Sequence, residues 1–205
     1  MNFFNTDNFL WRCFNKLADF VLLSCIWLLC CIPVVTIVPA CIALYDATAR
    51  CVYGPEGGTY GRFFRTFKIE LHRGIPLTLL WALIGFLLNA GYQVLCRLAE
   101  GSNSWTVFSI VYFCTLLIPI GTGCWAISLE SRFAYSFSVL HRNAFIFTFA
   151  HLPQTIAIVA LFVLALTVCI NIAPLGVVIP GFLAYIQAVF AERVLKRYMP
   201  KPTEE

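Results

Sequence analysis

The chain has 205 residues, of which 60% are hydrophobic and 12% are charged, and its formal net charge is +4. Ordinary soluble domains carry about 25% charged residues, and a soluble chain this apolar would have to expose much hydrophobic surface to water. The composition therefore excludes a typical soluble protein and predicts an all-α membrane protein with a single helical domain over residues 1–205.

The chain begins with an amphipathic segment, residues 1–16, whose Phe, Leu and Trp side chains suit one side of a helix. This pattern is typical of a helix that lies in the headgroup region of a membrane. Two apolar stretches follow, at 17–32 and 39–53. We expect both to be membrane spans, although each is shorter than the ~20 residues that a helical crossing usually needs.

Two prolines, Pro33 and Pro39, break the apolar run between these first two spans. Neither suits a helix interior, because proline lacks an N–H group and its ring clashes with a preceding carbonyl group. We therefore expect a helical hairpin with an apolar turn. The turn is predicted to be buried in the bundle, because non-helical backbone at membrane depth must be covered by protein or water.

A candidate polar site lies in the second span. Asp46 and Arg50 are four residues apart, where two side chains on a helix can form an ion pair. In one interpretation, the two residues lie at the inner interface and neutralise each other. In the other, they join Thr36 and Tyr45 in a polar site at the mouth of a cavity, because ionisable residues within a membrane face the bundle interior.

Four further spans bring the predicted total to about six, and they cover residues 75–96, 105–129, 152–172 and 174–191, before a cytoplasmic tail at 192–205. Pro119 and Pro180 lie in the middle of two of these spans, each with a glycine close behind. Helix breaks in corresponding halves can mark a transport site. They can also be structural kinks without a role in transport.

The basic residues indicate the orientation of these spans. Of the 14 Lys and Arg residues, only Arg97 falls in a predicted outer loop if the N-terminus is inside. Cytoplasmic loops collect Lys and Arg, so we expect a multi-pass protein of the cytoplasmic membrane with both termini in the cytoplasm. The net positive charge is then an orientation signal, and no nucleic-acid partner is expected.

Two predicted cytoplasmic loops resemble each other. The loop after the second span contains "GRFFRTFKIELHRG", and the loop after the fourth contains "SRFAYSFSVLHRN". Each predicts an interfacial amphipathic helix, which either only orients the bundle at the membrane surface or docks a cytoplasmic partner. The candidate docking residues are Arg62, Phe63, Phe67, Lys68, His72, Arg132, Phe133, Phe137 and His141.

Nothing in the sequence predicts catalysis. The ten cysteines include no CxxC spacing and lie almost wholly in apolar stretches, where cysteine packs as a small hydrophobic residue. No set of acid, base and nucleophile with a recognisable spacing accompanies the three histidines. We expect no enzymatic activity, no metal site and no cofactor.

Small residues within the spans suggest where helices pack. Gly and Ala allow two membrane helices to approach closely. We therefore expect the following residues to lie at helix–helix contacts: Gly85, Ala90, Gly91, Gly121 and Gly123.

Three segments carry a family resemblance: "NFFNTDNFLWRCFNKLADF", "WLLCCIPVVTIVPACIALY" and "GRFFRTFKIELHRG". They resemble the YesL-like family of small bacterial membrane proteins, a domain of unknown function. The resemblance is strongest over residues 1–73 and continues more weakly to "AERVLKRYMP" near the end. It implies an association with carbohydrate uptake systems, especially ABC-type sugar importers, and it assigns no catalytic residues.

Two functions follow as hypotheses. The first is an accessory or regulatory membrane subunit for bacterial oligosaccharide uptake, with an ABC-type sugar importer subunit as its partner. The second is a small-solute transporter or channel in its own right. The lipid bilayer is a partner in both cases, and the sequence leaves open whether the chain forms a homo-oligomer.

Overall fold

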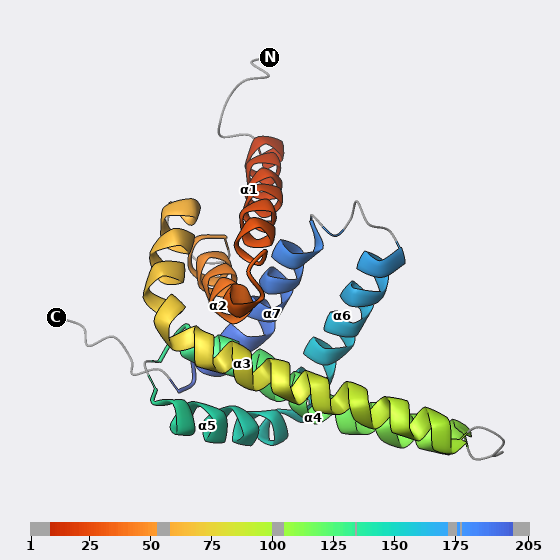
Figure 1. The fold of residues 1–205 in the computed structure, drawn as a ribbon. Coiled ribbons are helices and arrows are strands. Elements are labelled where there is room, and N and C mark those ends of the chain that lie inside the picture. Colours follow the sequence, from red (N-terminus) through yellow and green to blue (C-terminus); the bar gives the residue numbers. More distant parts are fainter. Residues whose placement is uncertain are drawn as a thin grey trace.

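The computed structural model describes residues 9–52, 58–99, 105–133, 135–171, 176 and 178–198. Within this part of the chain every regular element is helical, which confirms the all-α expectation (Figure 1). The helices are α1 (Phe9–Cys30), α2 (Ile37–Ala47), α3 (Thr59–Ala99), α4 (Trp105–Glu130), α5 (Phe137–Ala150), α6 (Leu152–Asn171) and α7 (Ile179–Leu195). Two short elements flank α2, namely the 3₁₀ turn η1 (Val34–Thr36) and the π-helical turn η2 (Thr48–Val52).

Several boundaries differ from the predicted ones. α1 begins at Phe9 and therefore includes part of the segment expected as a separate interfacial helix at 1–16, whose first eight residues lie outside the described part. α7 begins at Ile179 rather than at 174. By length and composition, two described helical segments could cross a membrane, Thr59–Arg97 and Leu152–Cys169. A topology with six crossings therefore stays a prediction.

α2 is the central helix of the fold. All of its residues from Val38 to Ala47 are buried except Cys41, which is half-buried, and α1, α3 and α7 surround it in Figure 1. Its 11 residues rise only ~16 Å at 1.5 Å per residue, which is about half of the ~30 Å hydrocarbon core. The expected span 39–53 thus corresponds to α2 followed directly by η2, which extends the helical segment to Val52.

The turn before α2 is not buried, and this prediction was wrong. Pro33 and Val34 are exposed, Val34 to 65%. The Thr36 hydroxyl lies 2.6 Å from the carbonyl oxygens of both Cys30 and Pro33, so the end of α1 is satisfied from within the turn. Because this side chain provides a local partner, the turn does not need cover from other helices.

α3 joins two predicted elements, the interfacial helix and the span 75–96, into one helix of 41 residues. It bends in the region of Gly74 and Pro76 (Figure 1), because a proline inside a helix removes one backbone hydrogen bond. α2 packs against this bend. A Cβ atom on Gly74 would lie 2.4 Å from Cγ of Pro39, so only glycine allows this contact.

The second half of α3 and the first half of α4 extend away from the other helices as a two-helix arm (Figure 1). Tyr112 of α4 donates a hydrogen bond to the carbonyl oxygen of Leu88 across the arm, at 2.7 Å. Much of the apolar surface of α3 is uncovered here, including Phe86, which is 70% exposed.

The prediction that small residues mark helix contacts was wrong on the arm. Added Cβ atoms on Gly85 and Gly91 would meet no atom within 4 Å, and Ala90 is exposed. Gly121 and Gly123, nearer the core, do lie against other helices, with Thr155 and Trp81 as their neighbours. α3 and α4 approach each other on the arm through larger side chains such as Tyr92 and Tyr112, whose ring centroids are 5.3 Å apart.

The core consists of two apolar clusters on either side of α2. One surrounds the fully buried Trp125, whose indole N–H donates to Oγ1 of Thr155 at 2.9 Å. The other contains Leu23, Leu44 and Phe63. α2 supplies residues to both clusters, so its position fixes the side chains that lie between them.

Candidate functional site

Asp46 on α2 is the centre of a buried ion-pair network. The residue is 1% exposed. Arg50 donates its Nε to Oδ1 at 2.7 Å, and Arg62 donates its Nε to Oδ2 at 2.7 Å. Thr66 adds a third donor, its hydroxyl, to Oδ2 at 2.7 Å. The expected pair of Asp46 and Arg50 is present, and the carboxylate has charged donors on both oxygens.

The local sequence explains how these donors converge. Arg50 lies one turn after Asp46, so the two side chains share a face of the chain. Arg62 and Thr66 are likewise four residues apart on α3 and point to the same side. Because α3 packs along α2, both reach the same carboxylate oxygen.

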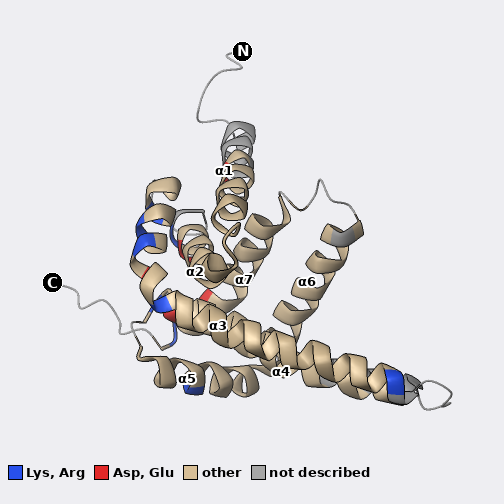
Figure 2. Ribbon diagram, viewed as in Figure 1, with Lys and Arg blue, Asp and Glu red and all other residues tan. Residues whose placement is uncertain are grey.

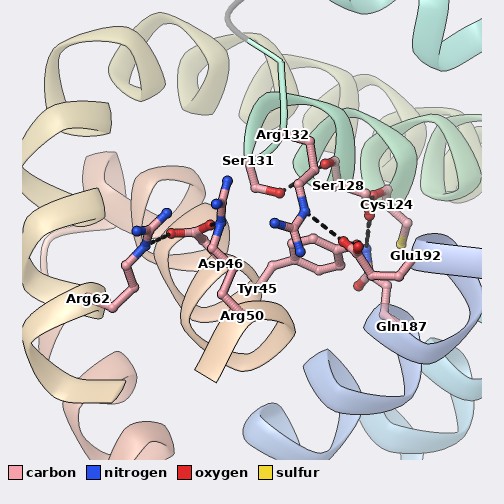
Figure 3. A network of polar contacts seen from close by, with 10 residues as sticks. All are labelled: Tyr45, Asp46, Arg50, Arg62, Cys124, Ser128, Ser131, Arg132, Gln187 and Glu192. Atoms are coloured by element: carbon pink, nitrogen blue, oxygen red, sulfur yellow. Dashed lines mark hydrogen bonds and ion pairs between the residues drawn. The ribbon is translucent and has the colours of Figure 1, made fainter. Parts of the chain in front are cut away.

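Glu192 on α7 forms a second buried ion pair, with Arg132 at the end of α4 (Figure 3). The Nε of Arg132 donates to Oε1 of Glu192 at 2.7 Å, and the Tyr45 hydroxyl donates to the same oxygen at 3.3 Å. The side chain of Arg132 is 11% exposed and that of Glu192 is 4% exposed. This pair is therefore sealed more completely from solvent than the Asp46 network.

The residues of the candidate polar site predicted from the sequence do not lie together in the structure. Tyr45 and Asp46 are neighbours on α2, yet Tyr45 faces Glu192 while Asp46 faces Arg62 (Figure 3). Thr36 belongs to neither group, because its hydroxyl bonds the turn at the end of α1. The four predicted residues thus lie in three places.

The sequence analysis did not identify Glu192 and Thr66 as site residues, and it did not predict that Arg62 and Arg132 form ion pairs. The sequence did contain a sign of these two ion pairs. Arg62 and Arg132 occupy matching positions in the two similar loops, and each pairs with a buried carboxylate. Glu192 lies just beyond the predicted span 174–191, and nothing in its neighbouring sequence indicates a partner 60 residues away.

Several candidate docking residues pack or bond within the chain. Phe63 is fully buried and stacks on Phe67 with ring centroids 6.1 Å apart. Phe133 packs against the cluster around Trp125, and Arg132 is held by Glu192. For the fully buried Phe63 the docking interpretation was wrong. Phe133 and Arg132 are half-buried and already have partners within the chain, so for them docking stays a prediction.

The remaining docking candidates lie nearer the surface. Lys68 and His72 on α3 are exposed, and Phe137 on α5 is 47% exposed. His141 is half-buried between aromatic rings, with its ring centroid 4.5 Å from that of Phe137 and 6.5 Å from that of Trp81. Its Nδ1 lies 2.9 Å from the Phe137 carbonyl oxygen. These residues stay candidates for a contact with a partner.

The two predicted mid-span breaks differ from each other. Pro119 does lie inside α4. Pro180 instead lies in the first turn of α7, where proline is tolerated because that N–H group has no helical partner. Each proline lines a largely apolar cavity, of about 410 Å³ at Pro119 and about 310 Å³ at Pro180.

Comparison with known proteins supports the resemblance seen in the sequence. Residues 8–92 match the model of a family described as "Protein of unknown function, DUF624". The matched range includes α2, the bend of α3 and the whole Asp46 network. No curated protein and no solved structure matches the chain. The family therefore brings no assigned activity, substrate or partner.

Proposed function

We propose that this chain, whose residues 8–92 match a family of unknown function, is an integral membrane protein with about six crossings and cytoplasmic termini. In this proposal it serves as an accessory or regulatory subunit for bacterial oligosaccharide uptake. The distribution of charge supports its placement in the membrane, the exposed arm supports the binding of a partner, and the family resemblance supports the link to oligosaccharide uptake.

The distribution of charge supports the proposed orientation. In Figure 2, most of the charged residues that are drawn lie toward the end of the molecule formed by the first part of α3, α2 and α5. The far end of the arm carries Arg97. An apolar arm that extends away from the charged end of the molecule fits a membrane protein whose charged end faces the cytoplasm.

The exposed arm is the observation that carries the accessory role. Leu83, Phe86 and Leu87 on α3 are between 55% and 70% exposed, which suits contact with lipid. Asn89 and Gln93 are also exposed on this helix, with Nε2 of Gln93 donating to Oδ1 of Asn89 at 2.9 Å. Amides facing lipid are unfavourable, and such groups commonly form hydrogen bonds to a neighbouring helix. We therefore propose that a partner helix packs along the arm.

The pairing of the buried carboxylates with arginine supports a structural role for Asp46 and Glu192 rather than a catalytic one. The carboxylates of Asp46 and Glu192 are each bonded to arginine at 2.7 Å. Such pairs join α2 to α3 and α4 to α7, and neither carboxylate is left as a base. An accessory subunit needs this kind of stable frame and no reactive group of its own.

The link to oligosaccharide uptake rests on the family resemblance alone. A subunit of an ABC-type sugar importer is the proposed partner on that ground. The geometry adds a condition that the partner must meet: it must present a membrane helix with a polar side chain that can bond Asn89 or Gln93.

The test is co-purification from the native membrane in mild detergent. The variant N89L/Q93L removes both amides from the exposed face, and Thr167→Val on α6 is the matched control, because Thr167 is exposed and bonds its own helix at Val163. We expect an importer subunit to accompany the wild type and the control in fixed ratio, and to be lost from the double variant. If all three chains purify without a partner, the accessory role is wrong.

Transport by the chain itself is the second candidate. The two cavities beside Pro119 and Pro180 favour it, because they share the lining residues Cys41, Cys124 and Phe162. Their walls are largely apolar, and the amide nitrogen of Gln187 is already bonded to the carbonyl oxygen of Cys124 at 2.9 Å. This lining suits an apolar solute better than a sugar. Flux into proteoliposomes of the purified chain, compared with empty liposomes, tests this candidate directly.

A further inference from the structure

A cavity of about 460 Å³ lies where the bend of α3 meets the end of α4 and the start of α5. Its polar lining comes from Glu70 and Arg73 on α3 and from Glu130, the last residue of α4. The rings of Tyr135 and Phe137 form part of its wall. Neither of the two buried ion pairs lines this cavity, so it is a separate feature of the fold.

The two acids in this cavity differ from the other buried acids of the protein. Glu70 is only 9% exposed, yet its Oε2 is buried without a hydrogen-bond partner, and the same is true of Oε2 of Glu130. A buried polar atom without a hydrogen-bond partner is costly, and the nearby charge of Arg73 offsets only part of this cost for the two acids. Burial raises the pKa of Glu130, which lies just beyond the expected span 105–129, to about 7, and the charge of Glu70 adds to this rise.

The donor set indicates which ligand fits. Two carboxylates with unused acceptor oxygens suit a cation that carries N–H donors. A hard metal ion such as Ca²⁺ takes six or more oxygen ligands, and no group of three His, Cys, Asp or Glu residues forms in the described part of the chain. The aromatic rings of Tyr135 and Phe137 favour an organic cation, because the face of a ring attracts positive charge.

We propose that this cavity binds a primary amine, whose ammonium group donates to Oε2 of Glu70 and to Oε2 of Glu130 beside the rings of Tyr135 and Phe137. The ligand supplies the hydrogen-bond donors that these two Oε2 atoms lack and adds a positive charge to that of Arg73. The site holds the bend of α3 against the start of α5, so an occupied site stabilises the charged end of the molecule.

Two sources carry this chemistry. One is the ethanolamine headgroup of phosphatidylethanolamine, because the cavity lies at the charged end of the molecule (Figure 2). A lipid would also give Arg73 a phosphate partner. The other source is a soluble amine from the cytoplasm.

The experiment uses the full chain in nanodiscs and measures the thermal unfolding midpoint and the heat of binding. Ethanolamine is the soluble probe. For the lipid probe, nanodiscs of phosphatidylethanolamine are compared with nanodiscs of phosphatidylcholine, whose headgroup has no N–H donor. We expect one probe or both to raise the midpoint saturably. Glu70→Gln and Glu130→Gln should each weaken binding about tenfold or more, because each removes a charged hydrogen bond.

Two control variants separate this site from a general charge effect. Lys68→Gln changes an exposed charge two residues from Glu70 and should leave amine binding unchanged. Arg73→Gln removes a positive charge from the cavity lining and should tighten the binding of ethanolamine. Without a probe, Glu70→Gln should be at least as stable as the wild type, since it removes a charge that burial disfavours, and this shows that the variant folds.

The outcomes distinguish the sources and expose a failure. Stabilisation only in phosphatidylethanolamine nanodiscs identifies the lipid headgroup, and stabilisation only by ethanolamine identifies a soluble amine. The proposal is overturned if neither probe stabilises the wild type, if sodium chloride at equal ionic strength has the same effect, or if Glu70→Gln and Glu130→Gln bind as well as the wild type.

Discussion

Arg62 and Arg132 stand at matching positions in two similar segments, and each donates its Nε to a buried carboxylate at 2.7 Å. The surroundings of the two pairs differ. Asp46 receives two arginines whose side chains are 27% and 25% exposed, whereas Glu192 receives one arginine that is 11% exposed. The same Arg-Phe motif thus supplies one of two partly exposed arginines at Asp46 and the single, almost fully buried arginine at Glu192.

The difference in solvent exposure of the arginines determines how much unfolding free energy is lost when one partner of each pair is removed. An arginine that reaches solvent can be rehydrated when its partner is lost, so the cost of breaking the pair is partly recovered. A sealed arginine cannot be rehydrated without opening the packing around it. Loss of one partner should therefore cost more at Glu192 than at Asp46, although Asp46 has more bonds.

The largest effect is expected for Arg132→Met, which leaves Glu192 buried without its countercharge. Breaking a buried pair from one side costs about 3–5 kcal/mol of unfolding free energy. Reversible unfolding of the purified chain in mixed detergent micelles measures this cost. The double variant R132M/E192L should recover most of the loss, because an apolar pair of similar volume replaces the ion pair. A single variant as stable as the wild type would contradict the sealed pair.

Asp46→Asn should have the second largest effect. It removes the charge of the carboxylate that both arginines share, but each arginine is about a quarter exposed, so we expect a loss of roughly 2–3 kcal/mol. The same unfolding measurement applies, with Asp19→Asn as a control, since Asp19 has a half-buried hydrogen bond to Tyr60. The activity of the proposed partner uptake system should stay intact if Asp46 is structural. A fall in uptake with unchanged stability would instead make Asp46 a functional residue.

Much of the helical framework could be predicted from the sequence, because it depends on local pattern. Long apolar stretches predicted α4 and α6 nearly to their ends, and the spacing of Asp46 and Arg50 predicted their ion pair. These features depend on residues within a few turns of one another, where helix geometry alone decides which side chains meet.

The features that could not be predicted depend on packing between distant segments. The sequence pattern predicts that Phe63 lies on an amphipathic surface helix, yet it is fully buried because the part of α3 before the bend packs against α1 and α2. The ion pair of Glu192 joins residues 60 positions apart. Small residues on the arm failed as contact markers because the arm presents that face outward. In each case the outcome depends on where another helix lies, and the sequence around these residues gives no sign of that.

A smaller effect is expected when only one of the two arginines on Asp46 is removed. In Arg62→Gln, the carboxylate keeps Arg50 on Oδ1 and Thr66 on Oδ2, so the loss should be about 1 kcal/mol. Arg50→Gln should behave alike. The double variant R50Q/R62Q should lose clearly more than the sum of the two, because it leaves Asp46 without any countercharge. Additive losses would mean that the two arginines act independently.

The smallest effect is expected for Tyr45→Phe, which removes the hydroxyl that lies 3.3 Å from Oε1 of Glu192 and keeps the ring. A neutral hydrogen-bond donor to a carboxylate that already holds an arginine should contribute about 0.5–1.5 kcal/mol. The same substitution in the R132M/E192L background tests the assignment, since the carboxylate that accepts from this hydroxyl is then gone. There Tyr45→Phe should be neutral or stabilising. An equal loss in both backgrounds would mean that the hydroxyl of Tyr45 contributes through a partner other than Glu192, and Ser128 is the neighbour that could supply this contact.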